Sequence, residues 1–267
     1  MRIARFVTGD DPRYAVVEGD PGAEQLAVVT GDPLYTPVQF TGERVPFEEA
    51  RLLAPVIPRS KVVGIGKNYQ DHVNEMAGDL WTQAPTEPLV FLKPNTSVIG
   101  PGDPIVRPPQ STEVHYEGEL AVVIGRLCRD VPVERVSEVI FGYTCANDVT
   151  ARDLQRSDGQ WARAKGFDSF CPLGPWIVTD LAGDDLAVDD LALTTRLDGE
   201  VVQSGRTSQL IHGIPALVAY VSAAFTLLPG DVILTGTPAG VGPMLAGQRV
   251  EIEIEGIGTL SNPVVDR

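Results

Sequence analysis

Short apolar runs separated by turns dominate the chain from Lys61 onward. Each run is rich in Val, Ile and Leu and is bounded by Gly, Pro or Asp residues. Short runs with such boundaries are typical of strands and not of long helices. We therefore expect strands at 61–65, 89–92, 120–124, 140–146, 191–197, 231–235 and 250–254. A further run, residues 115–124, extends one of these strands toward its N-terminus.

Only one stretch has the length and the boundaries of a substantial helix. Residues 214–228 are largely apolar, with Pro215 in the expected first turn and Pro229 directly after the expected end. Proline is favoured at both of these places. Shorter helices are expected to start within 72–76 and 147–156. So few helices among many strands indicate a mostly β protein with some α structure (α+β), and not a doubly wound α/β sheet.

The N-terminal part differs from the rest in its pattern of apolar runs and turns. Up to residue 58, β-like runs at 14–18 and 25–29 alternate with turns rich in Gly, Asp and Pro. Residues 53–58 contain two prolines, and a residue that precedes proline avoids the helical region, which predicts an extended linker. We expect a small β-rich domain over residues 1–58 and a larger domain over residues 59–267.

Composition excludes several classes of protein. The chain has 21 basic and 36 acidic residues and a net charge of −15, which argues against a nucleic-acid surface. No apolar run reaches the roughly 18–20 residues of a membrane helix, and no apolar signal core follows Met1. Three cysteines without C-x-x-C spacing fit free thiols in a reducing compartment. We expect a cytoplasmic protein that binds neither nucleic acid nor membrane.

Three acidic residues suggest a metal site. Glu117 and Glu119 share one face of a predicted strand with Cα atoms roughly 6.5–7 Å apart, and Asp148 ends another predicted strand. Like charges that close are costly unless a cation lies between them or one takes a proton. Three carboxylates without Cys or His suit a hard ion such as Mg²⁺ or Mn²⁺. For the glutamate pair alone, a solvated strand face is the alternative.

The histidines differ in what they can do. His72 and Glu75 would share a helical face, where the carboxylate can orient the imidazole as a general base, although an exposed pair is the alternative. Residues 77–85 have the composition of a mobile loop that would order over bound substrate as a lid. His115 shares the strand parity of the glutamates but is not needed as a ligand. His212 is expected to be structural.

Two lysines and one loop could bind an anion. Lys93 and Lys165 lie among apolar residues, where an ammonium can bind a carboxylate or stabilise an oxyanion, although exposed lysines are the alternative. The loop 235–242 offers hydroxyls and backbone amides to a carboxylate, or it is an ordinary tight turn. Gly64 and Gly66 lack the companions of a nucleotide-binding loop, so we expect them to permit close approach of another group.

Six motifs occur in register along most of the chain. They are G-K-N-Y-Q-D-H (66–72), F-L-K-P (91–94), Y-E-G-E-L-A-V-V-I-G (116–125), N-D-V-T-A-R-D-L-Q (147–155), A-K-G-F-D (164–168) and L-P-G-D-V-I-L-T-G-T-P-A-G-V-G (228–242). Together they resemble the fumarylacetoacetate hydrolase superfamily over residues 61–265. The sequence is most similar to its short members, which include acylpyruvate hydrolases, oxaloacetate decarboxylases and hydroxyheptadienedioate isomerases.

This resemblance implies a rolled mixed β-sheet core, usually in a homodimer, and a set of site residues. It assigns Mg²⁺ or Mn²⁺ to Glu117, Glu119 and Asp148. It implies that His72 and Glu75 form a dyad on a lid. The residues that it places against the substrate are Lys165, Gln155 and Thr237.

One position departs from the pattern of the superfamily. Many relatives carry arginine where this chain has Lys67. Lysine cannot make the two-pronged contact with a carboxylate that arginine makes. We therefore expect a shorter or differently placed acid group on the substrate.

The sequence leads to a hypothesis of a metal-dependent enzyme that acts on a small 2-oxo or 1,3-dioxo acid. The ion would be chelated by the substrate and stabilise an enolate, Lys165 would share its charge, and His72 would activate water. The dyad favours C–C cleavage, by a hydrolase or decarboxylase, over isomerisation of a hydroxyheptadienedioate in aromatic catabolism. A ligand-binding protein that kept only the fold is a further alternative, which the intact set of carboxylates and lysine disfavours.

Overall fold

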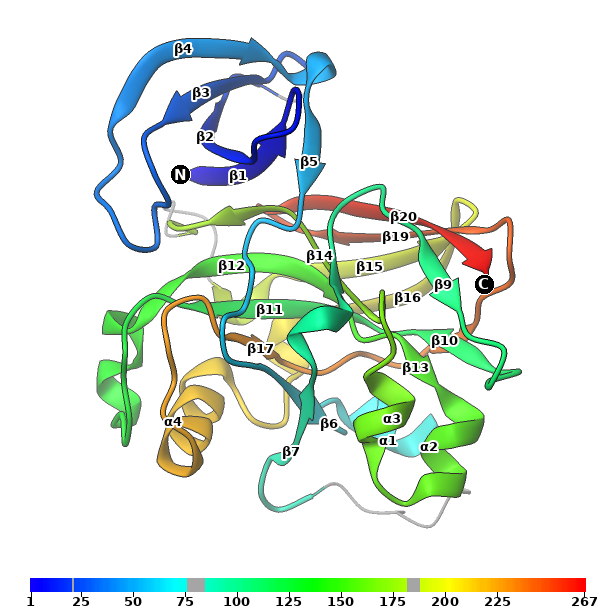
Figure 1. Cartoon of the computed structure of the whole chain (residues 1–267). Coiled ribbons are helices and arrows are strands. Elements are labelled where there is room, and N and C mark those ends of the chain that lie inside the picture. The colour runs from blue at the N-terminus through cyan, green and yellow to red at the C-terminus, as the bar shows by residue number, and fades with distance from the viewer. Residues whose placement is uncertain (21, 76–84, 182–187) are drawn as a thin grey trace.

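Most of the regular structure is β, as the sequence predicts. A computed structural model describes residues 1–20, 22–75, 85–181 and 188–267. Figure 1 shows one small group of strands above a larger body, with the helices around the lower part of that body. The mostly β fold class with a minor α component is confirmed.

The N-terminal strands continue into the main sheet. They are β1 (Arg2–Val7), β2 (Arg13–Glu18), β3 (Gln25–Val29), β4 (Phe40–Pro46) and β5 (Arg51–Leu53). β1 pairs antiparallel with β14 (Cys171–Val178), with Ile3 opposite Ile177. The pairing makes one sheet of the order β4-β3-β2-β1-β14-β12-β11-β17-β6-β7, with β5 and β8 attached at its side.

Two smaller sheets complete the larger body. The remaining strands of the main sheet are β6 (Val62–Gly66), β7 (Leu89–Lys93), β8 (Val98–Ile99), β11 (Gly118–Ile124), β12 (Ile140–Asn147) and β17 (Val232–Leu234). A three-stranded sheet contains β13 (Thr150–Ala151), β10 (Val114–Tyr116) and β18 (Gly242–Pro243). A five-stranded sheet contains β16 (Glu200–Arg206), β15 (Ala192–Leu197), β19 (Arg249–Ile254), β20 (Gly258–Asp266) and β9 (Ile105–Arg107).

The helices are short. They are α1 (Gln70–Glu75), α2 (Arg152–Asp158), α3 (Trp161–Lys165) and α4 (Ile214–Ala224). None of the helices in the described ranges has the length and apolar character that crossing a bilayer requires. The three cysteines are free thiols.

Burial on both faces explains why the central strands read as continuous apolar runs. On β11, Leu120 and Val122 face one hydrophobic cluster, while Ala121 and Val123 face another. The first cluster also contains Leu217 of α4, so this helix covers one face of the sheet. Strands covered on both sides need no polar face.

Several predicted boundaries are wrong, each because of a tertiary contact. The run 115–124 is two strands: β10 pairs with β13 and β18, while β11 pairs with β12 and β17. The helix predicted at 214–228 ends at Ala224, because Leu227 forms a bridge with Cys128. α2 begins at Arg152, within the stretch 147–156 that was expected to start a helix, because the two residues before it form β13.

Strands β14 and β20 were not predicted. β14 contains Pro172, Gly174 and Pro175, and β20 contains Pro263. Proline and glycine argue against a strand in a local pattern. Both strands are nevertheless held by partners distant in sequence, β1 and β12 for β14 and β19 and β9 for β20.

Asp231 joins two parallel strands of the main sheet, β6 and β17. Its fully buried carboxylate pairs with the ammonium of Lys61 at 2.6 Å and accepts hydrogen bonds from the Ser60 hydroxyl and the Leu228 amide. Asp231→Ala would leave these donors without their acceptor. We expect a loss of about 3–5 kcal/mol in the free energy of unfolding, measured by urea denaturation. Asp266→Ala, at an exposed ion pair with Arg107, is the control and should cost less than about 1 kcal/mol.

Candidate metal centre and active site

Strand pairing brings the three predicted metal ligands together. Glu117 lies between β10 and β11, Glu119 lies in β11, and Asp148 directly follows β12. The antiparallel register places Glu119 opposite Ala146, so the start of β11 meets the end of β12. The Asp148 amide donates to the Glu117 carbonyl at 2.9 Å. All three side chains are buried, and one carboxylate oxygen of each lies within 4.8 Å of the others.

Buried cations surround two of these carboxylates. The ammonium of Lys165 lies 2.8 Å from Glu117 and 2.6 Å from Asp148, and it also donates to the Thr150 hydroxyl. Lys93 donates to the other oxygen of Asp148 at 2.5 Å. Both lysines are 2% exposed, so the alternative of exposed lysines is wrong. The structure thus gathers positive charge at one point of a chain that is acidic overall.

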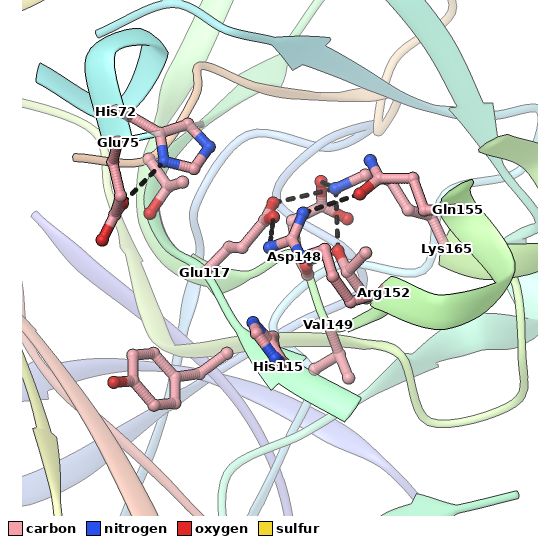
Figure 2. A network of polar contacts seen from close by, with 12 residues as sticks. His72, Glu75, His115, Glu117, Asp148, Val149, Arg152, Gln155 and Lys165 are labelled. Atoms are coloured by element: carbon pink, nitrogen blue, oxygen red, sulfur yellow. Dashed lines mark hydrogen bonds and ion pairs between the residues drawn. The ribbon is translucent and has the colours of Figure 1, made fainter. Parts of the chain in front are cut away.

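Arg152 is a functional candidate that the sequence analysis missed. Its guanidinium donates to Glu117 at 2.5 Å and to the side-chain oxygen of Gln155 at 2.7 Å (Figure 2). It is 3% exposed, and its Nε has no hydrogen-bond partner within the described part of the chain. Its place four residues after Asp148, at the start of a predicted helix, was the available signal. Through Arg152, the predicted substrate residue Gln155 is tied to the acidic trio.

The three carboxylates differ in charge state. Burial disfavours ionisation of Glu117, but the charges of Lys165 and Arg152 outweigh burial and hold its pKa well below the usual range. Burial, together with the charges of Asp148 and Glu117, raises the pKa of Glu119 well above its ordinary value. Burial lowers the pKa of Lys165, but Asp148 and Glu117 outweigh it and raise that pKa. Glu119 is therefore the carboxylate that lacks a compensating cation.

This arrangement fits a divalent ion. The donors are hard oxygen atoms that converge from three buried carboxylates, which is the set that Mg²⁺ and Mn²⁺ prefer. The known partner of Glu119 is the Gly236 amide, at 2.7 Å. A cation bound here would relieve the unfavourable burial of its charge. The alternative of a solvated strand face does not hold, because Glu117 and Glu119 are 4% and 2% exposed.

His72 and Glu75 lie on α1, facing the acidic trio (Figure 2). The Nδ1 atom of His72 is 3.3 Å from a Glu75 oxygen, and His72 is buried, while Glu75 is partly exposed. The Gly240 amide donates to the same carboxylate at 3.1 Å. The His72 hydrogen bond is the main reason that the pKa of Glu75 is lowered. Residues 77–84 of the predicted lid lie outside the described residues.

The loop 235–242 joins the dyad to β11, the strand that carries Glu119. Its Gly240 amide contacts Glu75, and its Gly236 amide contacts Glu119. The Thr237 hydroxyl donates to the Gly118 carbonyl at 2.9 Å and accepts from the amide of Gln203 at 2.8 Å. These bonds fix the loop against β11, so the loop is more than an ordinary tight turn. The Thr237 hydroxyl is used within the protein.

Two aromatic rings lie against the paired glycines of β6. A Cβ on Gly64 would lie 2.1 Å from the ring of Phe91, and a Cβ on Gly66 would lie 2.5 Å from the ring of Trp161. The expectation that these glycines permit close approach of another group is confirmed, because the rings of Phe91 and Trp161 occupy the space beside them. Lys67 follows in the left-handed region with a φ of 57°.

The remaining histidines lie apart from the trio. His115 belongs to β10, and its Nε2 contacts Glu113 at 3.2 Å. Burial and the charge of Arg152 lower its pKa. Because β10 ends before Glu117 and β11 begins after it, His115 does not belong to the same strand as Glu119, as the expected alternation of side chains required. Both backbone polar groups of His212 bond to the Asn68 side chain, which fits a structural role.

Two family models match the chain. Residues 61–265 match the fumarylacetoacetate (FAA) hydrolase C-terminal model, and residues 1–55 match an N-terminal model named Rv2993c-like. The chain belongs to the fumarylacetoacetate hydrolase family. The resemblance inferred from the six motifs is therefore confirmed.

Three relatives of this chain have names that state three different reactions. The crystal structure of 2-hydroxyhepta-2,4-diene-1,7-dioate isomerase from Mycobacterium marinum is 49% identical, covers 100% of this chain and 99% of its own, and has a TM-score of 0.89. Human mitochondrial oxaloacetate tautomerase FAHD2A is 44% identical over 83% of this chain and 71% of its own length. Maleylpyruvate hydrolase from Sphingobium sp. SYK-6, in complex with manganese(II) and pyruvate, is 34% identical over 100% of this chain and 99% of its own, with a TM-score of 0.79.

Proposed function

We propose that this protein is a Mg²⁺- or Mn²⁺-dependent enzyme that cleaves a C–C bond in a small 2-oxo or 1,3-dioxo acid. The convergence of three buried carboxylates, within 4.8 Å of one another and beside the buried ammonium of Lys165, carries this proposal. A divalent ion held by Glu117, Glu119 and Asp148 would polarise the carbonyl of a chelated oxo acid. The complex of a related hydrolase with manganese(II) and pyruvate supports this choice of ion and ligand.

Lys165 would stabilise the negative charge that forms on the substrate. When the C–C bond breaks, its electron pair stays on the fragment that carries the 2-oxo acid, which becomes an enolate. The Lys165 ammonium is 2% exposed and lies 2.6 Å from Asp148, which supports a position beside the proposed ion, where that charge would develop. A preorganised cation in a site without water stabilises such a charge strongly. Protonation of the enolate carbon then gives the free oxo acid.

His72 would act as the general base for a hydrolytic reaction. In the tautomer that donates from Nδ1 to Glu75, the basic nitrogen is Nε2, which can take a proton from water. The resulting hydroxide attacks the carbonyl carbon farther from the acid group of a 1,3-dioxo acid. The bond from this carbon to the methylene between the two carbonyl groups then breaks. A decarboxylation releases CO₂ instead and needs no attacking water.

Isomerisation is a second candidate function. The names of an isomerase at 49% identity and a tautomerase at 44% identity favour it. The same residues would then remove a proton from one carbon and return it to another, and no bond between carbons would break. Both functions pass through the same kind of enolate, so the reaction products distinguish them.

A substrate screen tests the proposal. The purified protein, with Mg²⁺ or Mn²⁺, is incubated with acetylpyruvate, fumarylpyruvate, oxaloacetate and a hydroxyheptadienedioate, and products are followed by NMR. We expect metal-dependent release of pyruvate from at least one of the first three. Interconversion of the dienedioate without any C–C cleavage would show that isomerisation is the function. No turnover of any compound would favour a ligand-binding protein.

His72→Ala should separate the two kinds of cleavage. Loss of the general base is expected to lower kcat for acylpyruvate hydrolysis by about 100- to 10,000-fold. Oxaloacetate decarboxylation should fall by less than about tenfold, because it requires no activated water. The exposed neighbour Asp71, changed to Asn, is the control and should leave both rates unchanged. An equal loss in both reactions would contradict a role for His72 in water activation.

A further inference from the structure

A cavity of about 350 Å³ lies beside α3, the helix that carries Lys165, and Trp161 of this helix is part of its lining. It lies between β7, the residues just before that strand, and the turn that joins α2 to α3. Its lining is mainly apolar and aromatic, and the residues that matter here are Lys67, Leu89, Val90, Phe91, Gln160 and Trp161. Pockets with this kind of lining bind the apolar parts of small molecules.

Two rings connect this cavity with the acidic trio. The Lys165 ammonium lies 4.9 Å from the centre of the Phe91 ring and 5.8 Å from the centre of the Trp161 ring. The same ammonium bonds to Glu117 and Asp148. Since Phe91 and Trp161 both line the cavity, one pair of side chains contacts the lysine of the site and also forms a wall of the cavity.

The position of this wall is built into the fold. The two rings meet edge to face, with centres 5.5 Å apart and planes inclined at 66°. Each ring occupies the space that a side chain on β6 would otherwise fill, because Gly64 and Gly66 have no Cβ. A wall supported by a strand of the main sheet gives the cavity a fixed shape, which a binding site requires.

We infer that this cavity binds the part of the substrate beyond the oxo-acid group and selects a flat, apolar or conjugated tail. The inference rests on the proposed function, in which the ion and Lys165 hold the oxo-acid group itself. A four-carbon acid such as oxaloacetate would leave the cavity unused. Aromatic rings offer their faces and edges to a planar chain. Among the described residues of the lining, Lys67 is the one that carries a charge, and this charge is opposite to that of a second carboxylate on the tail.

Two unreactive ligands test this inference by calorimetry on the Mn²⁺-loaded protein. Oxamate carries the oxo-acid group alone, and N-butyl oxamate adds an apolar tail of four carbons. Burial of each methylene is worth about fourfold in affinity. We expect N-butyl oxamate to bind about 10- to 100-fold more tightly than oxamate. Equal affinities would overturn the inference and leave the proposed function standing, whereas failure of both ligands to bind would overturn the two together.

Substitutions of two leucines on β7 test whether the tail binds in this cavity. Leu89 lines the cavity and is 39% exposed, while Leu92, on the same strand, is 42% exposed and is not part of the lining. Leu89→Trp fills the cavity and should abolish the advantage of N-butyl oxamate, with oxamate affinity unchanged within about twofold. Leu92→Trp should keep the wild-type ratio. If Leu89→Trp also keeps it, the tail lies elsewhere and the inference is wrong.

Discussion

Glu119→Gln is expected to abolish divalent-metal binding and to lower metal-dependent turnover by at least about 1,000-fold. Three carboxylates converge at the site, and this substitution removes one charged ligand with almost no change in shape. Loss of a ligand oxygen's charge weakens the hold on a hard cation, and the metal supplies several kcal/mol of charge stabilisation in the transition state. The hydrogen bond from the Gly236 amide can still be accepted by the glutamine oxygen.

The metal-free protein should not lose stability in this variant. Burial and the charges of Asp148 and Glu117 raise the pKa of Glu119 above its value in the unfolded chain. Between the two pKa values the folded state binds more protons than the unfolded state, so stability falls as the pH rises through that window. Glutamine cannot ionise. Metal-free Glu119→Gln should therefore equal or exceed the wild type in stability, most clearly at the upper end of the pH range.

Calorimetric titration with Mn²⁺ and urea denaturation at several pH values check both parts. The control is Glu113→Gln, which changes a carboxylate whose side chain is 34% exposed and lies outside the trio. That variant should bind Mn²⁺ as the wild type does. A Glu119→Gln protein that still binds Mn²⁺ with wild-type affinity would contradict the assignment of the metal centre.

Lys165→Met is expected to destabilise the metal-free protein by about 3–5 kcal/mol and to lower turnover by about 100-fold or more. The variant leaves the buried carboxylates of Glu117 and Asp148 without the cation that lies 2.6–2.8 Å from them. Removing one partner of a buried ion pair leaves an uncompensated charge, which is far more costly than the pair itself. Lys93 and Arg152 reduce this cost, because each still contacts one of the two carboxylates.

Added Mn²⁺ should recover much of the lost stability but not the lost turnover. The ion replaces the missing positive charge between the carboxylates, and binding to the folded state alone stabilises it. It cannot replace the ammonium beside the substrate. Denaturation with and without Mn²⁺, together with kcat, measures these effects. Arg163→Ala, at an exposed position of the same helix, is the control. A metal-free Lys165→Met protein as stable as the wild type would show that the ion pairs contribute little.

Local patterns were sufficient for most strands and for the composition of the site. Seven expected strands correspond to β6, β7, β11, β12, β15, β17 and β19. Strands such as β11 and β17 are buried on both faces and require a continuous apolar run, whereas β15 and β19 alternate buried and more exposed positions. Glu117, Glu119 and Asp148 stand out because two of them share one face of an expected strand and the third ends another apolar run. Their residue types alone specify a hard cation.

Contacts between segments that are distant in the sequence could not be predicted from local patterns. The strand break at Glu117 depends on separate partners for β10 and β11. Arg152 contacts Glu117 and Lys93 contacts Asp148. These pairs are distant in the sequence, and only the fold brings them together. Likewise, nothing near Gly64 in the chain indicates that the ring of Phe91 fills the space beside it.

The sequence by itself determined the β-rich architecture and the kind of ion that the acidic residues can hold, since these follow from periodicity and side-chain chemistry. The family followed from the resemblance carried by the six motifs. Only the tertiary structure decided which carboxylate has its pKa raised by burial, how the dyad is tied to the loop at Gly240, and that the rings beside Lys165 also line a cavity. Charge compensation and cavity shape depend on distances between residues far apart in the chain, and no local pattern encodes those distances.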